Sequence, residues 1–391
     1  MTPAEGNGSM DFDVVVVGGG ASGVDAATEV HRRAPGASVA LISPESDLFY
    51  RPWLVYLPAE AVPAADLSVP LAGIASAQGF QHIQDSVGAV HPDSGEVTLA
   101  SDARRISYRQ LILAPGAPAD RDRIPGAAEH ALFPCDRLEA RELLRQLGGL
   151  TEGTVTFLLT GERIGPGLEY AGWIARAARD AGRTSFKVTV VEDGDVMDRQ
   201  FGPRGADRLA SIAGALGIET VRHAQVERIE SDKLLLASAT VGTDLVCVTS
   251  PLRGPDLGLP AELLNQHGML RVDATLAVPE YGNVFAAGDF SDVRDLSLEL
   301  PKTWMMARLQ AETAARNAAA ALGGGGPVPL DERKAARMAA VSMPDIGGRT
   351  LFVRNKKPLV AGSWPLRLRY RMDAKYLSRY RTEPGATRPS R

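Results

Sequence analysis

The stretch Asp13-Val-Val-Val-Val-Gly18-Gly-Gly20-Ala-Ser-Gly23 decides the fold of this 391-residue chain. A short β-branched run ends in closely spaced glycines, and residues 21–33 are then predicted to form a helix that Ala34-Pro35-Gly36 stops. Residues 38–42 follow as a second buried strand. In this order of strand, glycine turn, helix and strand, a Gly-x-Gly-x-x-Gly pattern predicts a dinucleotide site.

Each glycine of the turn has a physical role. Gly18 permits the tight turn, Gly20 lets the backbone approach a pyrophosphate, and Gly23 lets the helix pack close to the strand. The helix N-terminus adds free N–H groups and a partial positive charge for the phosphates. An acid normally ends the second strand and holds the ribose; here the expected position is Ser43, and Glu45 is the nearest carboxylate. The alternative is a glycine-rich loop that binds no ligand.

The composition indicates a soluble globular protein with enough apolar material for two or three domains. Hydrophobic residues make up 45% of the chain and charged residues 23%, and the net charge of −4 argues against nucleic-acid binding. Two cysteines exclude a disulfide scaffold and leave no Cys/His cluster for a metal, and no apolar run is long enough for a membrane-spanning helix. The start lacks the order of a secretory signal, so residues 1–11 are predicted to be a disordered lead.

A second unit of the same kind occupies the middle of the chain. Its elements are strand 154–159, glycine turn 161–167, helix 168–180 and strand 186–191. We therefore predict an α/β fold with two Rossmann-like dinucleotide-binding domains, the second inserted in the first. The predicted boundaries are 12–118 with 255–326 for the first domain, 119–254 for the second, and 327–391 for a small C-terminal segment.

Two later segments indicate which dinucleotide is bound. Leu111-Ile-Leu-Ala-Pro-Gly116 and Val284-Phe-Ala-Ala-Gly-Asp289 resemble the later fingerprints of FAD-binding two-dinucleotide-domain flavoproteins, with Pro115 in place of the usual threonine. The resemblance implies that FAD is the cofactor and that the Asp289 carboxylate accepts a hydroxyl of the ribityl chain. The other residues assigned to FAD in this part of the chain are Val87, Ala114, Pro115, Gly116 and Gly288.

Three further segments narrow the family. They are Phe49-Tyr50-Arg51-Pro52-Trp53-Leu54, Ile164-Gly165-Pro166-Gly167-Leu168-Glu169-Tyr170 and Leu300-Pro301-Lys302-Thr303. Together they resemble the sulfide:quinone oxidoreductase and flavocytochrome c sulfide dehydrogenase group, whose relatives include type II NADH dehydrogenases. The resemblance implies an FAD-dependent oxidoreductase that passes electrons from a small-molecule donor to a quinone-like acceptor.

The same resemblance assigns roles to four residues. It places Arg51 and Pro52 along the flavin ring, although their spacing alone indicates only a loop. Lys302 is expected to begin a helix that points at the flavin pyrimidine ring, where a cation stabilises negative charge; the alternative is a surface lysine. Glu169 matches a glutamate that relatives keep beside the flavin as a proton relay, and its alternative role is a polar residue stabilised by the helix dipole.

The chain departs from the sulfide-oxidising group at the redox cysteine pair. Arg163-Ile164 and Val341–Gly347 stand where that group carries cysteines. Without a thiolate and a resolving partner, sulfide oxidation by the family mechanism is not expected unless Cys135 substitutes. Some members place a cysteine at this position, near the flavin or bonded to it; the alternative is an unreactive loop cysteine. Cys247 lies in an apolar strand and is predicted to be a core residue.

The second glycine turn argues against a nicotinamide dinucleotide. A binding turn would need glycines near positions 162 and 164, where the chain has Glu162 and Ile164. The carboxylate would meet a pyrophosphate, and the isoleucine would block close approach of the backbone. Two alternatives stay open: a soluble NAD(P)H-dependent reductase of the same fold, and a flavin-binding protein without catalysis.

The C-terminal tail combines basic and aromatic residues. Residues 364–391 contain eight Arg or Lys and two acids. Large apolar side chains recur every four residues, as on a helix: Trp364, Leu368, Met372, Tyr376 and Tyr380. Such a segment fits an anionic membrane surface, whereas a helix packed on the FAD domain or at a homodimer interface explains much of the same pattern. We therefore expect a cytoplasmic protein, with peripheral contact to the inner face of the membrane as the alternative.

Overall fold

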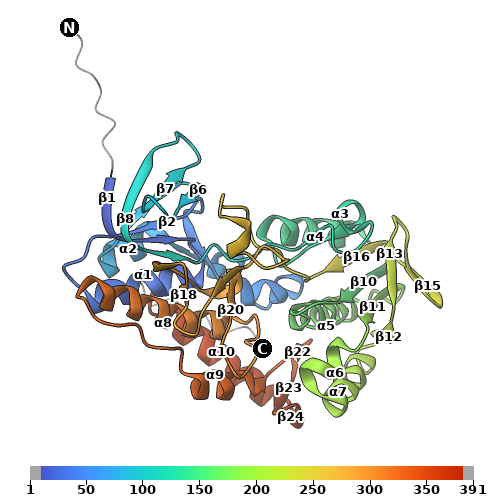
Figure 1. Ribbon diagram of the computed structural model, residues 1–391. Coiled ribbons are helices and arrows are strands. Elements are labelled where there is room, and N and C mark those ends of the chain that lie inside the picture. Colours follow the sequence, from blue (N-terminus) through green and yellow to red (C-terminus); the bar gives the residue numbers. More distant parts are fainter. Residues whose placement is uncertain (1–9, 382–391) are drawn as a thin grey trace. The chain divides into compact units, whose positions relative to one another are not determined.

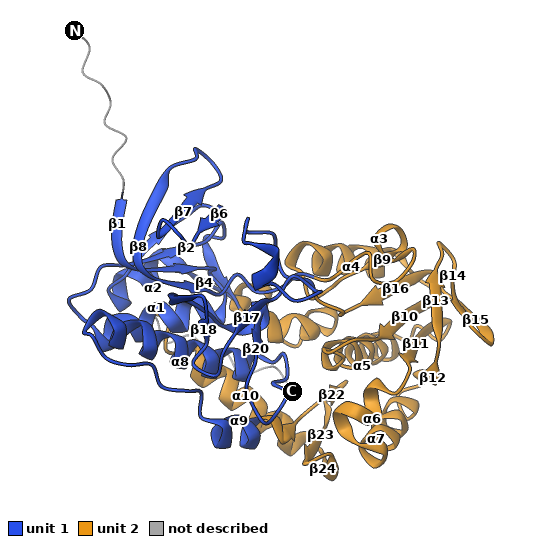
Figure 2. Ribbon diagram, in the orientation of Figure 1, with its two compact units in different colours: residues 1–49, 68–118, 253–338 blue, residues 50–67, 119–252, 339–391 orange. Residues whose placement is uncertain are grey.

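The computed structural model describes residues 10–381, and the chain divides into two compact units (Figure 2). Unit 1 consists of Met1–Phe49, Ser68–Pro118 and Arg253–Met338. Unit 2 consists of Tyr50–Leu67, Ala119–Leu252 and Ala339–Arg391. Each unit is therefore built from three separate stretches of sequence.

A β-sheet with the strand order β18-β19-β8-β1-β2-β5 forms the centre of unit 1 (Figure 1). From β19 to β5 the strands run parallel, while β18 pairs with β19, and β7 with both β6 and β8, in antiparallel fashion. The bounds are β1 (Met10–Val17), β2 (Val39–Ile42), β5 (Gln81–Ile83), β6 (Val87–His91), β7 (Glu96–Leu99), β8 (Arg105–Leu113), β18 (Ala277–Val278) and β19 (Tyr281–Ala286). The valines at 14–17 are at most 5% exposed, as expected for a central parallel strand.

Two long helices, α1 (Ala21–Arg33) and α8 (Trp304–Leu322), pack against each other in unit 1 (Figure 1). The N-cap of α8 is Thr303, whose hydroxyl accepts a hydrogen bond from the Met306 N–H at 3.3 Å. The remaining elements of unit 1 are β3 (Asp47–Phe49), β4 (Ser68–Pro70), α2 (Leu71–Gln78), η3 (Ala261–Leu263), β17 (Leu270–Val272), η4 (Gly288–Phe290), β20 (Ser291–Val293) and most of α9 (Glu332–Ala339).

Unit 2 contains a parallel sheet in the order β12-β11-β10-β16-β9. Its strands are β9 (Ala131–Leu132), β10 (Gly153–Leu159), β11 (Phe186–Asp193), β12 (Glu219–Ala224) and β16 (Leu245–Val248). Its helices in this part of the chain are α3 (Ala127–His130), α4 (Arg137–Gly149), α5 (Gly165–Asp180), α6 (Val196–Phe201) and α7 (Pro203–Gly214). A separate antiparallel sheet joins β13 (Val226–Ile229), β14 (Lys233–Leu236) and β15 (Ala239–Gly242).

The C-terminal elements of unit 2 are β21 (Val341–Ser342), β22 (Asp345–Ile346), β23 (Arg349–Arg354), β24 (Lys357–Gly362) and α10 (Ser363–Leu377). The first four form one small antiparallel sheet, and α10 packs against β23 and β24. The same unit includes the 3-10 helices η1 (Arg51–Ala59) and η2 (Ala64–Leu67). Hydrogen bonds and ring contacts with α5 and α10 explain why this early segment belongs to unit 2.

The units differ from the predicted domains in where short segments belong. Tyr50–Leu67 and the residues from Ala339 onward group with unit 2, whereas the prediction gave the first stretch to the FAD domain and the second to a separate segment. Met10 and Asp11 form the start of β1, and residues 1–9 of the predicted lead lie outside the described residues. So do residues 382–391 of the predicted tail.

The helix of the tail does not present one apolar row. Trp364 is 60% exposed, whereas Tyr376 is 2% exposed, although both belong to the predicted row of every fourth residue. A spacing of four drifts around a helix of 3.6 residues per turn, so the two rings face different surroundings. The helix is instead buried through Leu366, Asp373, Tyr376 and Leu377.

Candidate functional site

Four parallel strands of unit 1 end in one row across the sheet. Val17 of β1 lies beside Ile42 of β2 and Leu113 of β8, and Leu113 lies beside Ala286 of β19. The first residues after these strands are Gly18, Ser43, Ala114 and Ala287. Backbone hydrogen bonds of 2.8–3.0 Å join three of these exits to neighbouring strands. The carboxyl edge of a doubly wound parallel sheet is the place where such folds bind dinucleotides.

The glycine turn after β1 is closely packed on the protein side and open at Gly20. A Cβ on Gly18, whose φ is +111°, would lie 2.2 Å from the Ala114 carbonyl oxygen, and a Cβ on Gly23 would lie 1.8 Å from that of Gly18. At Gly20, the N-cap of α1, a Cβ would meet no atom within 4 Å, and the cap has no side-chain hydrogen bond. Space and uncapped N–H groups therefore coincide, and this turn fits the phosphates of FAD.

Ser43, the first residue after β2, holds the carboxylate of Glu45 near the end of this strand. Its side chain is fully buried, and its Oγ donates a hydrogen bond to Oε2 of the exposed Glu45 at 2.9 Å. The Asp85 N–H donates to the Ser43 carbonyl at 3.1 Å, and Val87 begins β6 two residues further on. His82 of β5 contacts the same loop, and its partial burial lowers the pKa of the imidazole. Ser43 and Glu45 together thus occupy the position of a ribose-binding acid.

The exit of β19 is the turn η4, which carries Asp289. Gly288 has a φ of +80°, and its N–H donates to Oε1 of the buried Gln310 at 2.7 Å. Lys302 lies two residues before α8, and its Nζ donates to the carbonyls of Asp289 at 2.9 Å and Ser291 at 2.7 Å. The Lys302 ammonium group therefore stabilises the η4 segment that carries Asp289, and Lys302 itself precedes the first residue of α8.

Most of the predicted cofactor residues of unit 1 follow the row of strand ends or lie within a few residues of it, whereas Val87 begins β6 and Lys302 lies two residues before α8. Ala114 is buried, and Gly116 has a φ of +78° in the turn after Pro115. The residues that the structure brings to this edge are Gly18, Gly20, Gly23, Ser43, Glu45, Ala114, Pro115, Gly116, Gly288 and Asp289. Arg51, Pro52, Glu169 and Cys135 belong to unit 2.

The corresponding turn of unit 2 is occupied by the protein's own groups. Gly161 has a φ of +69°, and a Cβ there would lie 3.1 Å from the Cα of Pro251. Glu162 is exposed in the turn, and its Oε1 accepts a hydrogen bond from the Leu252 N–H at 3.4 Å. Gly167 packs against the side chain of Leu159. Only this last glycine retains the helix-packing role of the nucleotide-binding pattern.

The acid at the end of β11 is buried and paired inside unit 2. Glu192 is fully buried; its Oε1 accepts from the Met197 N–H at 2.8 Å, and its Oε2 accepts from Arg222 Nε at 2.9 Å. The same guanidinium also contacts Asp198 and Asp207. The last residue of β11, Asp193, also has protein partners: its two oxygens accept from the Thr160 hydroxyl and the Val226 N–H, both at 3.1 Å. Since the oxygens of both carboxylates have protein partners, these contacts argue against a ribose-binding acid at this strand end.

Glu169 is engaged in a buried ion pair. It is 5% exposed and binds Arg369 of α10 through both oxygens, with Arg369 Nη2 at 2.9 Å from Oε2. The Asp345 N–H donates to Glu169 at 3.3 Å, and the Asp345 carboxylate accepts from Trp173 Nε1 and the Gly348 N–H, both at 3.0 Å. Burial, with the nearby negative charge of Glu169, raises the pKa of Asp345 to about 6.

Arg51 and Pro52 lie between two buried side chains. Arg51 is exposed and Pro52 half-buried, whereas Tyr50 and Trp53 are 1% and 3% exposed. The Tyr50 hydroxyl and the Trp53 indole N–H donate to the two oxygens of Asp373, at 2.8 Å and 3.0 Å. Burial raises the pKa of this carboxyl group.

The sequence predictions do not include Arg369 and Asp373, which lie one helical turn apart on α10. Their partners Glu169 and Tyr50 are 200 and 323 residues away in the chain, so no local pattern reveals the contacts. One signal was available: Asp373 is the sole acid between residues 346 and 381, a stretch otherwise rich in Arg and Lys. A single acid in a basic helix favours a buried partner.

The two cysteines have different surroundings. Cys135 is half-buried and precedes α4, whose N-cap Asp136 accepts hydrogen bonds from the N–H groups of Leu138 and Glu139. The Asp136 carboxylate therefore already binds the N–H groups at the start of α4, which would otherwise stabilise a Cys135 thiolate. Cys247 lies in β16 with no exposed surface, and burial raises the pKa of its thiol. The structure thus places Cys247 in the core of unit 2.

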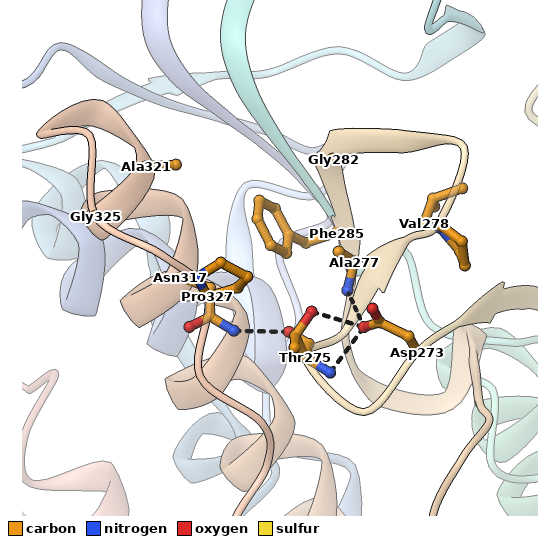
Figure 3. Close-up of a pocket in the computed structure, with 11 residues that line it drawn as sticks. Asp273, Thr275, Ala277, Val278, Gly282, Phe285, Asn317, Ala321, Gly325 and Pro327 are labelled. Carbon is orange, nitrogen blue, oxygen red and sulfur yellow. Dashed lines mark hydrogen bonds between the residues drawn. The ribbon is translucent and has the colours of Figure 1, made fainter.

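A hollow of about 170 Å³ in unit 1 is lined by residues that include Asp273, Thr275, Phe285 and Asn317 (Figure 3). Its Asp273 carboxylate accepts from the Thr275 N–H at 2.7 Å, and Asn317 Nδ2 donates to the Thr275 carbonyl at 2.8 Å. Asn317 lies about 20 Å along α8 from its first residue, Trp304. The polar groups here satisfy one another, so the hollow is not a candidate active site. Within residues 10–381, no group of three or more metal-binding side chains occurs.

Comparison with known proteins identifies a family pattern along most of the chain. Residues 12–311 match the pattern described as pyridine nucleotide-disulphide oxidoreductase. The mitochondrial sulfide:quinone oxidoreductase of Mus musculus is 26% identical over 304 residues, which are 72% of this chain and 66% of that protein. The demethylphylloquinone reductase NdbB of Synechocystis is 24% identical over 351 residues, 84% of each chain. The chain thus spans about two thirds of the mouse relative's length.

A solved structure shows the same fold. The sulfide:quinone oxidoreductase of Aquifex aeolicus superposes with a TM-score of 0.81, covering 95% of this chain and 92% of the other at 22% identity. The predicted fold class, an α/β protein with two dinucleotide-binding-type domains, is thereby confirmed. The described helices are each too short or too polar to cross a membrane.

Proposed function

Because the chain belongs to the pyridine nucleotide-disulphide oxidoreductase family and is an FAD-dependent oxidoreductase, we propose that it transfers two electrons from a small-molecule donor to a quinone-like acceptor. Bound FAD supplies the electron-transfer chemistry. The observation that carries the proposal is the row of four parallel strand ends in unit 1, directly followed by the predicted cofactor residues. The relatives named for quinone reduction support the acceptor class.

The residues of unit 1 have separate tasks in this proposal. Gly20 and the N-terminus of α1 bind the pyrophosphate, and Glu45, held by Ser43, binds the ribose of the adenosine half. The Asp289 carboxylate binds the ribityl chain. Lys302 fixes the turn that carries Asp289 and keeps a positive charge beside it. Val87, Ala114, Pro115, Gly116 and Gly288 line the cofactor through the backbone or small side chains.

The residues of unit 2 contribute differently. We propose that Arg51 and Pro52 line the flavin ring, as the resemblance implies. Glu169 can relay a proton only by exchanging its contact with Arg369, because the guanidinium binds both carboxylate oxygens. We therefore propose that a proton relay through Glu169 is coupled to Arg369 and to Asp345, whose pKa of about 6 allows Asp345 to change protonation near neutral pH.

The donor is proposed to react without a dithiol relay. Cys247 is buried in β16, and no cysteine occurs at the two positions where the sulfide-oxidising relatives are expected to carry them. The other cysteine of the sequence, Cys247, has no exposed surface and a thiol pKa raised by burial, so we propose that the two thiols do not cycle between dithiol and disulfide. The remaining candidate role of Cys135 is a covalent tether to FAD, which intact mass under denaturing conditions tests. A polypeptide mass without added FAD would remove this role.

The alternative donor is NADH or NADPH bound at the turn of unit 2. Glu162 in that turn and the internally paired Glu192 speak against it. The discriminating measurement is anaerobic stopped-flow absorbance of the holoenzyme mixed with sulfide, a thiol, NADH or NADPH. We expect no bleaching of the flavin by either nicotinamide. Rapid bleaching by NADH or NADPH would instead establish the reductase alternative.

The acceptor can be tested before the donor is known. The holoenzyme is reduced by light under anaerobic conditions and then mixed with a short-chain quinone or with buffer containing oxygen. We expect reoxidation to be faster with the quinone than with oxygen at equal concentration. Equal rates, or no effect of the quinone, would exclude a quinone acceptor and favour a flavin-binding protein without catalysis.

We also propose peripheral membrane contact through the hairpin β23–β24 and the start of α10. Leu359, Val360 and Trp364 are 60%, 45% and 60% exposed, and residues 346–364 contain basic side chains but no acid. The test is flotation with vesicles of anionic phospholipid. The double variant Leu359→Ser, Trp364→Ser should float less than the unmodified protein; equal flotation of the two would contradict this contact. A homodimer remains a separate prediction, which sedimentation would test.

A further inference from the structure

The segment Tyr50–Leu67 is held in unit 2 by aromatic contacts on two sides. The ring of Tyr56 in η1 packs edge-on against Trp173 of α5, with centroids 5.4 Å apart, and against Tyr370 of α10 at 5.1 Å. Tyr56 has no exposed surface. The C-terminal helix thus forms one wall of the site that holds an early segment of the chain.

One carboxylate of α10 accepts hydrogen bonds from both side chains that flank Arg51 and Pro52. Oδ1 of Asp373 accepts from the Tyr50 hydroxyl at 2.8 Å, and Oδ2 accepts from the Trp53 indole at 3.0 Å. The rings of Tyr50 and Trp53 also meet edge to face, with centroids 5.6 Å apart. Asp373 is 1% exposed, so water does not compete for these bonds.

The pair between the two anchors faces outward. Arg51 is exposed and Pro52 is half-buried, although the residues on either side are almost fully buried. Pro52 fixes its own φ and restricts the residue before it, which limits the conformations of the pair. With both ends anchored and the centre restricted, the backbone at Arg51 and Pro52 is fixed in position.

The same helix also ties down the other end of the segment and its neighbour α5. Arg381, just after α10, donates to the Asp66 carbonyl, and Arg369 forms the two-point ion pair with Glu169. Arg369 and Asp373 are four residues apart, which places them on one face of α10. The polar face of this helix therefore contacts two of the segments on which the family resemblance rests.

We propose that Asp373 is a positioning residue for the cofactor, because it fixes the Tyr50 and Trp53 anchors that orient Arg51 and Pro52. This proposal rests on the proposed role of Arg51 and Pro52 at the flavin ring. It gives the C-terminal helix a task besides any membrane contact.

The test compares two substitutions at Asp373 with one control substitution at Arg371. Asp373→Leu removes both acceptors, whereas Asp373→Asn keeps a similar shape, accepts from Trp53 and can donate to the Tyr50 oxygen. Arg371→Met is the matched control, because Arg371 is exposed on the same helix. The readouts are the FAD dissociation constant, the visible flavin spectrum and midpoint potential, and the thermal unfolding temperature.

We expect Asp373→Leu to weaken FAD binding by ~5-fold or more and to shift the flavin spectrum and potential, since a lost hydrogen bond is equivalent to about 1 kcal/mol. Asp373→Asn should restore most of the difference, and Arg371→Met should leave all readouts unchanged. A lower unfolding temperature with an unchanged flavin would overturn the proposal and leave Asp373 a purely structural residue.

Three further variants keep the outcomes separable. If Asp373→Leu does not fold, Tyr50→Phe and Trp53→Phe each remove one donor and should shift the flavin in the same direction. Arg51→Met tests the proposed function directly. If Arg51→Met changes the flavin and the anchor variants do not, the positioning role is wrong and the cofactor role of Arg51 stands. If Arg51→Met has no effect on the flavin, the cofactor role itself is wrong.

Discussion

The two glycine turns of this protein share a strand–turn–helix–strand order but differ in how their polar groups are used. In unit 1 the turn is open at Gly20, and the carboxylate near the second strand, Glu45, is exposed. In unit 2 the turn carries Glu162, and the carboxylate of the second strand, Glu192, is fully buried between Arg222 and a backbone N–H. In our proposal, the same supersecondary unit therefore serves a ligand in unit 1 and the stability of the protein in unit 2.

This difference teaches that a dinucleotide-type fold alone does not establish a dinucleotide site. A dinucleotide site also requires that the polar groups of the glycine turn and the acid at the strand end are not already hydrogen-bonded to other protein groups. Substitutions at matched positions can therefore separate the two uses, because loss of a ligand contact lowers affinity whereas loss of an internal contact lowers stability.

The largest effect is expected for Gly23→Val. Even a Cβ at this position would lie 1.8 Å from the Gly18 carbonyl oxygen, so β1 and α1 cannot keep their close approach. We expect little soluble protein and no bound FAD, measured by yield, circular dichroism and the flavin-to-protein ratio. The comparison in unit 2 is Gly167→Ala, whose Cβ would come within 3 Å only of the end of the flexible Leu159 side chain and would meet Thr249 at an ordinary contact distance of 3.5 Å. It should fold and retain FAD, and equal damage by both changes would contradict the comparison.

The next effect is expected for Arg222→Met. This change leaves Glu192 buried without its guanidinium partner, and breaking a buried ion pair typically costs about 3 kcal/mol of unfolding free energy. Chemical denaturation should show this loss, while the FAD dissociation constant stays the same. A variant that keeps its stability but loses FAD would show that the strand end of unit 2 serves the cofactor.

A smaller effect, on affinity rather than stability, is expected for Gly20→Ala and Glu45→Gln. The Gly20 backbone has a φ of −76°, which alanine adopts, and a Cβ there meets no protein atom within 4 Å. We therefore expect normal unfolding but FAD binding weakened by about tenfold, equal to about 1.4 kcal/mol. Titration of the apoprotein with FAD provides the measurement. Unchanged affinity in both variants would place the phosphates and ribose elsewhere.

The smallest effect concerns pH and the buried acids of unit 2. The pKa of Asp345 is raised to about 6 in the folded protein, so its neutral form stabilises the fold at low pH and this stabilisation is lost as pH rises through 6. The expected loss is about 0.8 kcal/mol between pH 5.5 and pH 7.5. Asp345→Asn cannot titrate and should reduce this slope in urea unfolding experiments. A steeper slope in the variant would contradict the assignment.

Much of the fold followed from local sequence patterns. The predicted helix at residues 21–33 has these same bounds in the structure, because a glycine turn and a Pro-Gly stop mark them locally, and the apolar strand predicted around Cys247 is β16. The FAD-dependent fold, predicted from three fingerprints, is confirmed by the family match and the structural likeness. The helix expected from Lys302 begins at Trp304, because Thr303 provides the cap.

The polar network of unit 2 could not be predicted from local patterns. The pairs Glu169–Arg369 and Tyr50–Asp373 join residues far apart in the chain, and even the isolated acid Asp373 carries no signal that identifies which residue is its partner. The assignment of Tyr50–Leu67 to unit 2 has the same cause, since these long-range contacts decide it. Glu45 was a candidate by proximity alone, and the Ser43 hydrogen bond supplies the physical link.

The interleaving of the two units constrains how the nascent chain folds on the ribosome. Unit 1 lacks β19 and α8 until residues up to 322 have been synthesised, and unit 2 lacks α10 until residue 377. Neither hydrophobic core can be completed early during translation, so partly exposed strands such as β1 and β10 persist in the growing polypeptide. Chaperone capacity during expression should therefore limit the yield of this protein more than it limits a protein of equal size whose domains follow one another.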